Sequence, residues 1–325
     1  MNEWVTASAP GKFVILGEHS VVYGKPAVVL AVDRRFTCSI RRSDRNTLNG
    51  DASSFNRQPH FRYLTRNTTQ YYDYRSMSQI PPGSGMGSSA ALSAAVALAL
   101  RKDRNNNTTE EELALEAYGA ELFAQGNGSP MDASACVHGR GIGVNIPGTD
   151  DSHLWTVSRG GRTWSVSDLK VPDMTFVIGN TGIRAPTGPQ VDKVRRFMQH
   201  SGFAKDIIDE IAAVTLQGYN AIRRNDWTDL GELMTKDHKL LSILGVSCRE
   251  LNKLVNAALP YSYGAKLTGS GGGGCMVALT DKPEKTAEAI KTRGGTPYIV
   301  RTGVEGVRIE TDDPEDPVMD IPEMY

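Results

Sequence analysis

The chain has 325 residues, of which 39% are hydrophobic and 22% are charged, and its formal net charge is −1. This composition is that of an ordinary globular protein, and the length exceeds what one hydrophobic core usually supports, so we expect two domains. A net charge near zero argues against a nucleic-acid partner or an anionic membrane held by bulk electrostatics. Any anion-binding site must therefore be local.

The cysteines and the start of the chain predict a cytoplasmic protein. Cys38, Cys136, Cys248 and Cys275 are widely spaced and form no CxxC pair, which is typical of free thiols in a reducing compartment. The first residues show neither the basic nor the apolar region of a secretory signal. The longest apolar run, residues 90–100, is too short to span a bilayer.

The first part of the chain alternates short apolar runs with turn residues. The runs at 13–16 and 27–32 are separated by glycines, a pattern that predicts strand, loop and strand. Residues 41–78 have no clear periodicity and predict no definite element. The Ala- and Leu-rich run 90–100 predicts a helix.

A second helix is expected to begin at Thr109. Glu112 follows three residues later, which is the spacing of a capping box. This helix should reach about Gln125 and stop at Gly126. Further strands are expected at 141–146, 174–178, 275–279 and 298–301, and further helices at about 190–200, 203–224, 228–243 and 247–258. We expect the acidic residues after 311 to form a solvated terminus.

Three glycine-rich segments, far apart in the sequence, indicate a site for a polyphosphate. They are residues 9–12 (APGK), 81–89 (PPGSGMGSS) and 266–274 (KLTGSGGGG). Glycines let the backbone approach an anion closely, and the free N–H groups of a helix start point at negative charge. The second segment is the most informative because it leads directly into the helix expected at 90–100. Each segment taken alone is also explained as a turn.

The common nucleotide-binding patterns do not fit. The Walker pattern is absent, and so are the HRD and DFG signatures of protein kinases. Gly269, Gly271 and Gly274 satisfy GxGxxG, but a strand rather than a helix is expected to follow them. Phosphoryl transfer by another fold would need a metal, a cation and a group that orients the acceptor hydroxyl.

Polar residues near the glycine segments supply candidates for these parts. Ser88 and Ser89, at the expected helix start, suit either Mg²⁺ binding or simple capping. Glu121 lies in an apolar stretch, so it either points outward or has a polar partner. Asp132, expected in a loop, either meets a hydroxyl proton or forms a turn. Lys12 is either a phosphate-binding cation or a surface lysine.

The three segments resemble the signature motifs of the GHMP kinases, and PPGSGMGSSAA resembles that family's phosphate loop almost position by position. The resemblance covers nearly the whole chain except 41–78 and the acidic tail. Within the family, the chain resembles the branch of the mevalonate kinases, through residues 9–12 with 17–25, 181–187 (TGIRAPT), 240–247 (LLSILGVS) and 265–275.

This resemblance implies an α+β fold of two domains. Residues 1–170 would form an N-terminal ATP-binding domain like domain 2 of ribosomal protein S5, and residues 171–325 a ferredoxin-like C-terminal domain. ATP and substrate would lie between them. Family members are often dimers, so a homodimer is also implied.

The resemblance further implies roles for matched residues. Lys12 and Asp132 would be the catalytic pair, and Ser89 and Glu121 would hold Mg²⁺. The loop before the acid reads NGSPMD where the family usually has NPSGxD. That departure keeps the carboxylate and alters the turn before it.

Two further groups of residues would bind the substrates. Glu18, His19 and Thr187 would line the mevalonate pocket. Leu92 stands where animal mevalonate kinases carry a tyrosine. The residues expected to contact ATP are Pro82, Gly83, Ser84, Gly85, Met86, Gly87, Ser88, Ser89, Gly271 and Gly272.

The expected reaction is ATP-dependent phosphorylation of the primary 5-hydroxyl of (R)-mevalonate, with Mg²⁺ as cofactor and no nucleic-acid or membrane partner. One alternative is another GHMP kinase that acts on phosphomevalonate or a sugar. A second alternative is a non-catalytic member that binds ligand as a regulator. Retention of both the acid and the phosphate loop argues against the second.

Overall fold

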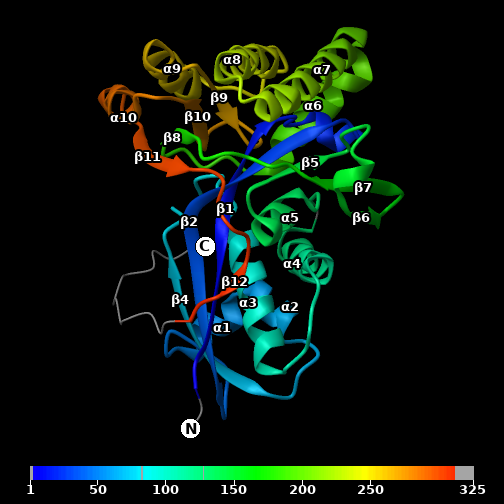
Figure 1. Ribbon diagram of the computed structural model, residues 1–325, viewed down its shortest axis with the longest axis vertical. Helices are drawn as coiled ribbons and strands as arrows, with labels where there is room; N and C mark the ends of the chain where they lie inside the picture. The colour runs from blue at the N-terminus through cyan, green and yellow to red at the C-terminus, as the bar shows by residue number, and fades with distance from the viewer. Residues whose placement is uncertain (1–2, 82, 127, 312–325) are drawn as a thin grey trace.

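The computed structural model describes residues 3–81, 83–126 and 128–311, which form two sheets with helices packed on each (Figure 1). The strands are β1 (Val5–Leu16), β2 (Ala27–Ser43), β3 (Thr47–Leu48), β4 (Tyr71–Ser78), β5 (Gly141–Val144), β6 (His153–Arg159), β7 (Arg162–Asp168), β8 (Thr175–Asn180), β9 (Gly264–Thr268), β10 (Cys275–Leu279), β11 (Thr296–Arg301) and β12 (Arg308–Ile309). The helices are α1 (Ala52–Arg57), α2 (Pro59–Leu64), α3 (Ser88–Asp103), α4 (Glu110–Gln125), α5 (Met131–His138), α6 (Thr187–His200), α7 (Gly202–Arg224), α8 (Trp227–Ile243), α9 (Arg249–Ala258) and α10 (Pro283–Thr292).

The first sheet is organised by the long antiparallel pair of β1 and β2. Its order is β12-β1-β2-β5-β7-β6, and β4 joins β2 to β3. The first part of β2 pairs with β5 and the last part with β4. Both predicted strands are present and are longer than their apolar runs. The reason is that polar residues outside those runs, such as Ser8 and Ser39, are also buried in the sheet.

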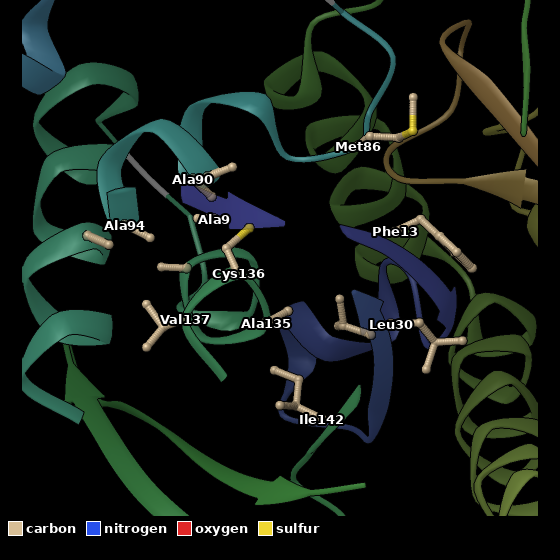
Figure 2. Packing of buried hydrophobic residues seen from close by; sticks show 14 of the residues in the cluster. Ala9, Phe13, Leu30, Met86, Ala90, Ala94, Ala135, Cys136, Val137 and Ile142 are labelled. Carbon is tan, nitrogen blue, oxygen red and sulfur yellow. The ribbon is translucent and has the colours of Figure 1, made fainter. Parts of the chain in front are cut away.

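The predicted helix at 90–100 is α3, which forms the centre of the first core. Its small side chains let it lie close against β1 and β2, and almost all of its residues from Ala90 to Leu100 are buried. Figure 2 shows Ala90 of α3, Ala9 of β1 and Cys136 of α5 within this cluster. The helix that carries the second glycine segment is therefore fixed by close packing, as expected for a rigid phosphate-binding element.

The second sheet has the order β11-β8-β10-β9, and all its pairs are antiparallel. α6 to α9 connect β8 to β9, and α10 connects β10 to β11. This β-α-β-β-α-β connectivity confirms the predicted ferredoxin-like domain. α8, α9 and α10 pack against the strands, and Figure 1 shows α7, α8 and α9 on the outer side of this sheet.

Helix α4 begins and ends as its sequence predicts. The Thr109 side chain accepts from the backbone N–H of Glu112, and the Glu112 side chain accepts from the backbone N–H of Thr109. Gly126 ends the helix in the left-handed conformation. The prediction that Asp132 lies in a loop is wrong, because Asp132 lies in the first turn of α5. Pro130 is the N-cap of this helix.

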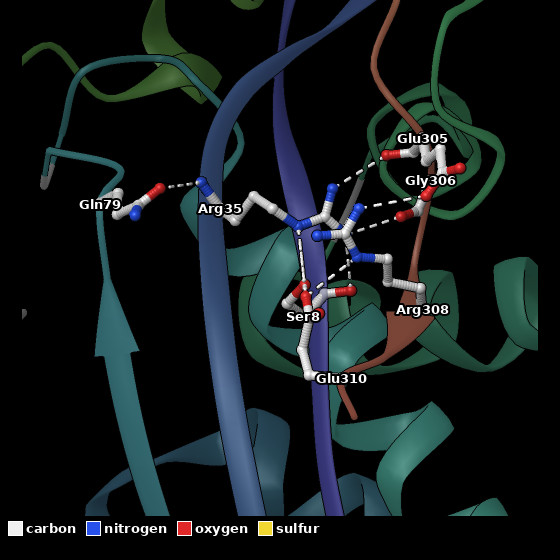
Figure 3. A network of polar contacts seen from close by, with 7 residues as sticks. All are labelled: Ser8, Arg35, Gln79, Glu305, Gly306, Arg308 and Glu310. Carbon is white, nitrogen blue, oxygen red and sulfur yellow. Dashed lines mark hydrogen bonds and ion pairs between the residues drawn. The ribbon is translucent and has the colours of Figure 1, made fainter. Parts of the chain in front are cut away.

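After β11 the chain returns to the first sheet, where β12 pairs with β1. Arg35 of β2 fastens this segment: its guanidinium donates to the Gly306 carbonyl at 2.7 Å and to Ser8 Oγ at 2.6 Å (Figure 3). Ser8 Oγ in turn contacts Glu310.

The domain boundary predicted at 170/171 falls between β7 and β8 and stays a prediction. The acidic tail lies outside the described residues. Within the described ranges, no helix is long and apolar enough to cross a membrane.

The buried His138 joins three elements of the N-terminal half. Its Nδ1 lies 2.7 Å from Glu110 at the start of α4, and its Nε2 lies 2.8 Å from Asp168 at the end of β7. Arg140 lies 3.8 Å from the same Asp168 oxygen. Burial lowers the pKa of His138, but the hydrogen bonds to Glu110 and Asp168 outweigh it, so the net pKa is raised.

We expect His138 to make stability depend on pH. Because the pKa of His138 is higher in the folded state, protonated His138 stabilises the fold. This contribution is complete below the pKa of the unfolded chain, about 6.5, and it is lost as pH rises through the pKa of the folded state. The loss of unfolding free energy in His138→Gln, measured by urea denaturation, should therefore be larger near about pH 6 than near about pH 9. An equal loss at both pH values would contradict a charged His138.

Candidate active site

Lys12 and Asp132 form an ion pair at the edge of the α3 N-terminus. Lys12 Nζ lies 2.8 Å from Asp132 Oδ2, and the Lys12 side chain is only 6% exposed. Lys12 Nζ also donates to the Gly85 carbonyl at 3.3 Å. Asp132 Oδ1 is buried and has no hydrogen-bond partner. The surface-lysine alternative is therefore excluded, and one carboxylate oxygen remains available to another molecule.

The second glycine segment packs directly on Lys12. The backbone N–H of Lys12 donates to the Met86 carbonyl at 2.9 Å. A Cβ on Gly87 would lie 2.7 Å from Lys12 Cε, and Gly87 has a φ of 70°. A side chain at this position would therefore clash and strain the backbone, so glycine is needed for the close approach.

The N-cap of α3 is Gly87 and not a serine. Because glycine has no side chain, the backbone N–H groups at the helix start receive no side-chain capping bond from it. Ser88 Oγ is buried without a hydrogen-bond partner, so it does not cap the helix. A free hydroxyl beside the open N–H groups of a 16-residue helix is the arrangement that binds phosphate. Ser84 Oγ is used within the loop, where it donates to the Pro81 carbonyl at 2.7 Å. Gly83 lies in the same loop, while Pro82 falls outside the described residues.

Ser89 and Glu121 meet across α3 and α4. Ser89 Oγ donates to Glu121 Oε2 at 2.7 Å, and Gln125 Nε2 donates to the same oxygen at 3.0 Å. Ser93 Oγ donates to Glu121 Oε1 at 3.2 Å. Glu121 is 14% exposed at its side chain, so it points inward and has polar partners.

This pair suits a Mg²⁺ site of the kind found with nucleotides. In the described part of the chain, no group of three or more His, Cys, Asp or Glu side chains could hold a metal ion. Mg²⁺ in phosphoryl-transfer sites is held by one or two protein oxygens together with substrate phosphates and waters. One hydroxyl and one carboxylate at the phosphate-binding helix match that ligand set.

Glu18, expected in the substrate pocket, lies in a buried charge cluster. It contacts Lys266 of β9, whose Nζ also lies 3.3 Å from Asp237 of α8. The three side chains are 0–2% exposed. Burial raises the pKa of Glu18 to about 7 and raises that of Asp237, both against the attraction of Lys266. The cluster joins the two halves of the chain.

His19, which follows β1, connects this part of the chain to the third glycine segment. Its Nε2 donates to the Ser270 carbonyl at 3.0 Å, and its Nδ1 is buried without a partner. Burial lowers the pKa of His19 and favours the neutral ring. Neutral His19 thus presents a free acceptor nitrogen, as a residue that binds a substrate hydroxyl would.

The third glycine segment packs between two loops of the C-terminal half. The Gly272 N–H donates to the Val246 carbonyl at 2.7 Å, and a Cβ on Gly271 would lie 2.0 Å from that same oxygen. The Gly274 N–H donates to the Ile183 carbonyl at 2.8 Å. Thr187 is the first residue of α6 and is exposed. It lies four residues after Ile183, in the same segment of the chain.

Several polar residues at these contacts were missed from the sequence. Asp237 carries no sequence signal, and Lys266 is indicated only as the start of the third glycine segment, because full burial of a lysine or an aspartate is rare. Gln125 could have been found, because it lies four residues after Glu121 on one helix face. His60 of α2 lies 3.0 Å from Glu121 but belongs to the stretch that showed no periodicity.

Comparison with known proteins identifies the family of this chain. The family model described as the GHMP kinases N terminal domain matches residues 59–140, and the one described as GHMP kinases C terminal matches residues 219–298. A mevalonate kinase of Pyrococcus abyssi is 32% identical over 95% of this chain and 99% of its own length. The chain therefore belongs to the GHMP kinase family.

Solved structures show the same fold. The crystal structure of L. major mevalonate kinase in complex with R-mevalonate is similar with a TM-score of 0.77 and 24% identity, over 91% of this chain and 94% of the other. Lactococcus lactis galactokinase complexed with galactose is similar with a TM-score of 0.72 and 18% identity, over 94% and 95%. These two proteins are in complex with different compounds, R-mevalonate and galactose. The fold alone therefore does not determine which substrate this chain binds.

Proposed function

We propose that this chain transfers the γ-phosphoryl group of ATP to the primary 5-hydroxyl of (R)-mevalonate. The observation that carries the proposal is the Lys12–Asp132 pair, in which Oδ2 is held by Lys12 and Oδ1 is buried without a partner. This pair adjoins the N-terminus of α3, where a polyphosphate would bind. An acceptor hydroxyl and a phosphoryl donor would thus meet at one place.

The residues of the chain divide the chemistry between them. Asp132 Oδ1 orients the acceptor hydroxyl and is placed to take its proton. The hydroxyl oxygen forms a bond to the γ-phosphorus as the bond to the β-phosphate oxygen breaks, and ADP leaves. Lys12 stabilises the charge on the transferred group. The N–H groups of Gly87 and the α3 start, with Ser88 Oγ, bind the phosphates.

Magnesium would be held by the Ser89 hydroxyl and the Glu121 carboxylate, and Ser89 Oγ lies 2.7 Å from Glu121 Oε2. The ion neutralises phosphate oxygens in such reactions. Gly271 and Gly272 would complete the nucleotide site. Neutral His19 would accept a hydrogen bond from mevalonate through Nδ1.

Mevalonate is favoured over other acceptors by sequence. Relatives from Pyrococcus abyssi, Pyrococcus furiosus and Archaeoglobus fulgidus, which are 30–32% identical over 94–95% of this chain, are named mevalonate kinases. The rival acceptors are phosphomevalonate and sugars, which other kinases of this fold use. The exposed Thr187 and the buried Glu18 stay predicted substrate residues. A cytoplasmic location and a homodimer also stay predictions.

A coupled assay of ADP release across mevalonate, phosphomevalonate, galactose and homoserine tests this function. We expect kcat/KM for mevalonate to exceed that for each other acceptor by about 100-fold or more, since a site built to bind particular polar groups rejects compounds that lack them. Faster turnover of phosphomevalonate or galactose would assign the chain to another branch of the family. No ADP release with any acceptor would favour a regulator.

A further inference from the structure

His60 is a buried histidine beside the carboxylate that we assign to magnesium. The residue is 2% exposed, and its Nε2 lies 3.0 Å from Glu121 Oε1. Neither ring nitrogen of His60 makes an aligned hydrogen bond. A buried polar atom left without a partner costs about 1–3 kcal/mol, so an imidazole kept in this state calls for an explanation.

The packing of α2 on α4 holds this ring in place. Tyr63, one turn along α2 from His60, places its hydroxyl 2.1 Å from where a Cβ on Gly119 would lie. Only a residue without a side chain permits that approach. The short helix α2 is thereby pressed onto α4 beside Glu121, which lies two residues after Gly119.

The two oxygens of Glu121 have separate neighbours. Oε2 is contacted by Ser89 and Gln125, and Oε1 by Ser93 and His60. A carboxylate held through one oxygen presents the other in a defined direction. Metal-binding carboxylates commonly depend on such supporting contacts, whose loss typically weakens metal affinity or activity by about 10–100-fold.

We propose that His60 is a positioning residue for Glu121. Its Nε2 contacts Oε1 and restricts rotation of the carboxylate, so that Oε2 stays directed to Ser89, with which it would hold magnesium. The inference rests on the proposed metal role of Glu121. It also assigns a function to one residue of the segment 41–78, for which the sequence predicted no definite element.

Binding of Mn²⁺ in the presence of ADP, titrated by electron paramagnetic resonance, tests this role without turnover. We expect His60→Phe, which keeps an aromatic ring and removes both nitrogens, to bind Mn²⁺ about 10-fold more weakly. Its affinity for metal-free ADP should equal that of the wild type. His60→Gln, whose amide can donate to Oε1, should recover part of the loss.

Two comparisons separate the possible failures. If Glu121→Gln keeps Mn²⁺ affinity, the proposed metal role of Glu121 is wrong. If Glu121→Gln loses Mn²⁺ affinity while folded His60→Phe keeps it within about twofold, the positioning role is wrong and His60 serves packing alone. His138→Gln, a buried histidine at another place, is the matched control and should bind Mn²⁺ as the wild type does.

A measurement on the unaltered protein covers the case in which the His60 variants fail to fold. The side-chain nitrogen resonances of His60 should shift when Mg²⁺ is added to the ADP complex. They should remain in place when ADP is added without metal. Resonances that do not respond to Mg²⁺ would overturn the proposal.

Discussion

Replacing Asp132 by alanine is expected to lower kcat by about 10²–10⁴-fold, the range that a positioned acid or base supplies. The change removes both the oxygen paired with Lys12 at 2.8 Å and the free oxygen that would meet the acceptor hydroxyl. Affinity for ATP should change little, because the phosphate loop keeps its own contacts with Lys12. Steady-state kinetics and nucleotide titration give the two quantities.

Two further variants make this result interpretable. Asp132→Asn keeps the volume and removes the charge, so a comparable loss in kcat would assign the effect to the carboxylate. Asp173→Ala removes an exposed aspartate paired with Arg301 and should leave kcat unchanged. Near-normal turnover in folded Asp132→Ala would remove Asp132 from the mechanism.

Lys266→Met is expected to destabilise the fold by about 3–5 kcal/mol, because it leaves buried acids without their cation. Lys266 is fully buried between Glu18 and Asp237, one from each half of the chain. The pKa of Glu18 is already raised to about 7 by burial, and losing Lys266 removes the attraction that opposes that rise. Urea denaturation measures the loss in unfolding free energy.

The pH dependence and a matched lysine identify the cause. Acids whose pKa is raised in the folded state stabilise it at low pH and lose that contribution as pH rises. Loss of Lys266 raises the Glu18 pKa further, so the cost of Lys266→Met should grow as pH rises above about 7. Lys236→Met removes a half-exposed lysine of α8 that pairs with Glu210 of α7, and it should cost no more than about 1 kcal/mol. A similar cost for both lysines would contradict the buried cluster.

Local chemistry made parts of the fold predictable. The helix from Glu110 to Gln125 was located at both ends because its capping box and terminal glycine act within a few residues. The glycine segments indicate a phosphate site because phosphate binding needs open backbone N–H groups, and that role stays a prediction. Asp132 was assigned to a loop because Gly, Ser and Pro precede it, whereas its helix is supported by tertiary burial of the following Ala133 and Cys136.

Contacts between distant segments were not predictable. Nothing in the sequence connects His60 with Glu121, or Lys266 with Glu18, because each pair is brought together by packing. The strand β4 was missed although Tyr72 and Tyr74, both fully buried, alternate with more exposed neighbours. The hairpin of β6 and β7 turns at Gly160 and Gly161, and this Gly-Gly pair is itself a turn signal in the sequence.

The position of the transferred phosphate tests the central claim most directly. The enzyme is incubated with ATP, Mg²⁺ and (R)-mevalonate, and the product is examined by phosphorus NMR with proton coupling retained. Phosphorylation of the primary 5-hydroxyl predicts a phosphomonoester signal split by two equivalent neighbouring protons, and Asp132→Ala should yield almost none of it. A signal without that splitting, from the tertiary hydroxyl, or no new phosphorus signal beyond those of the nucleotide, would contradict the account.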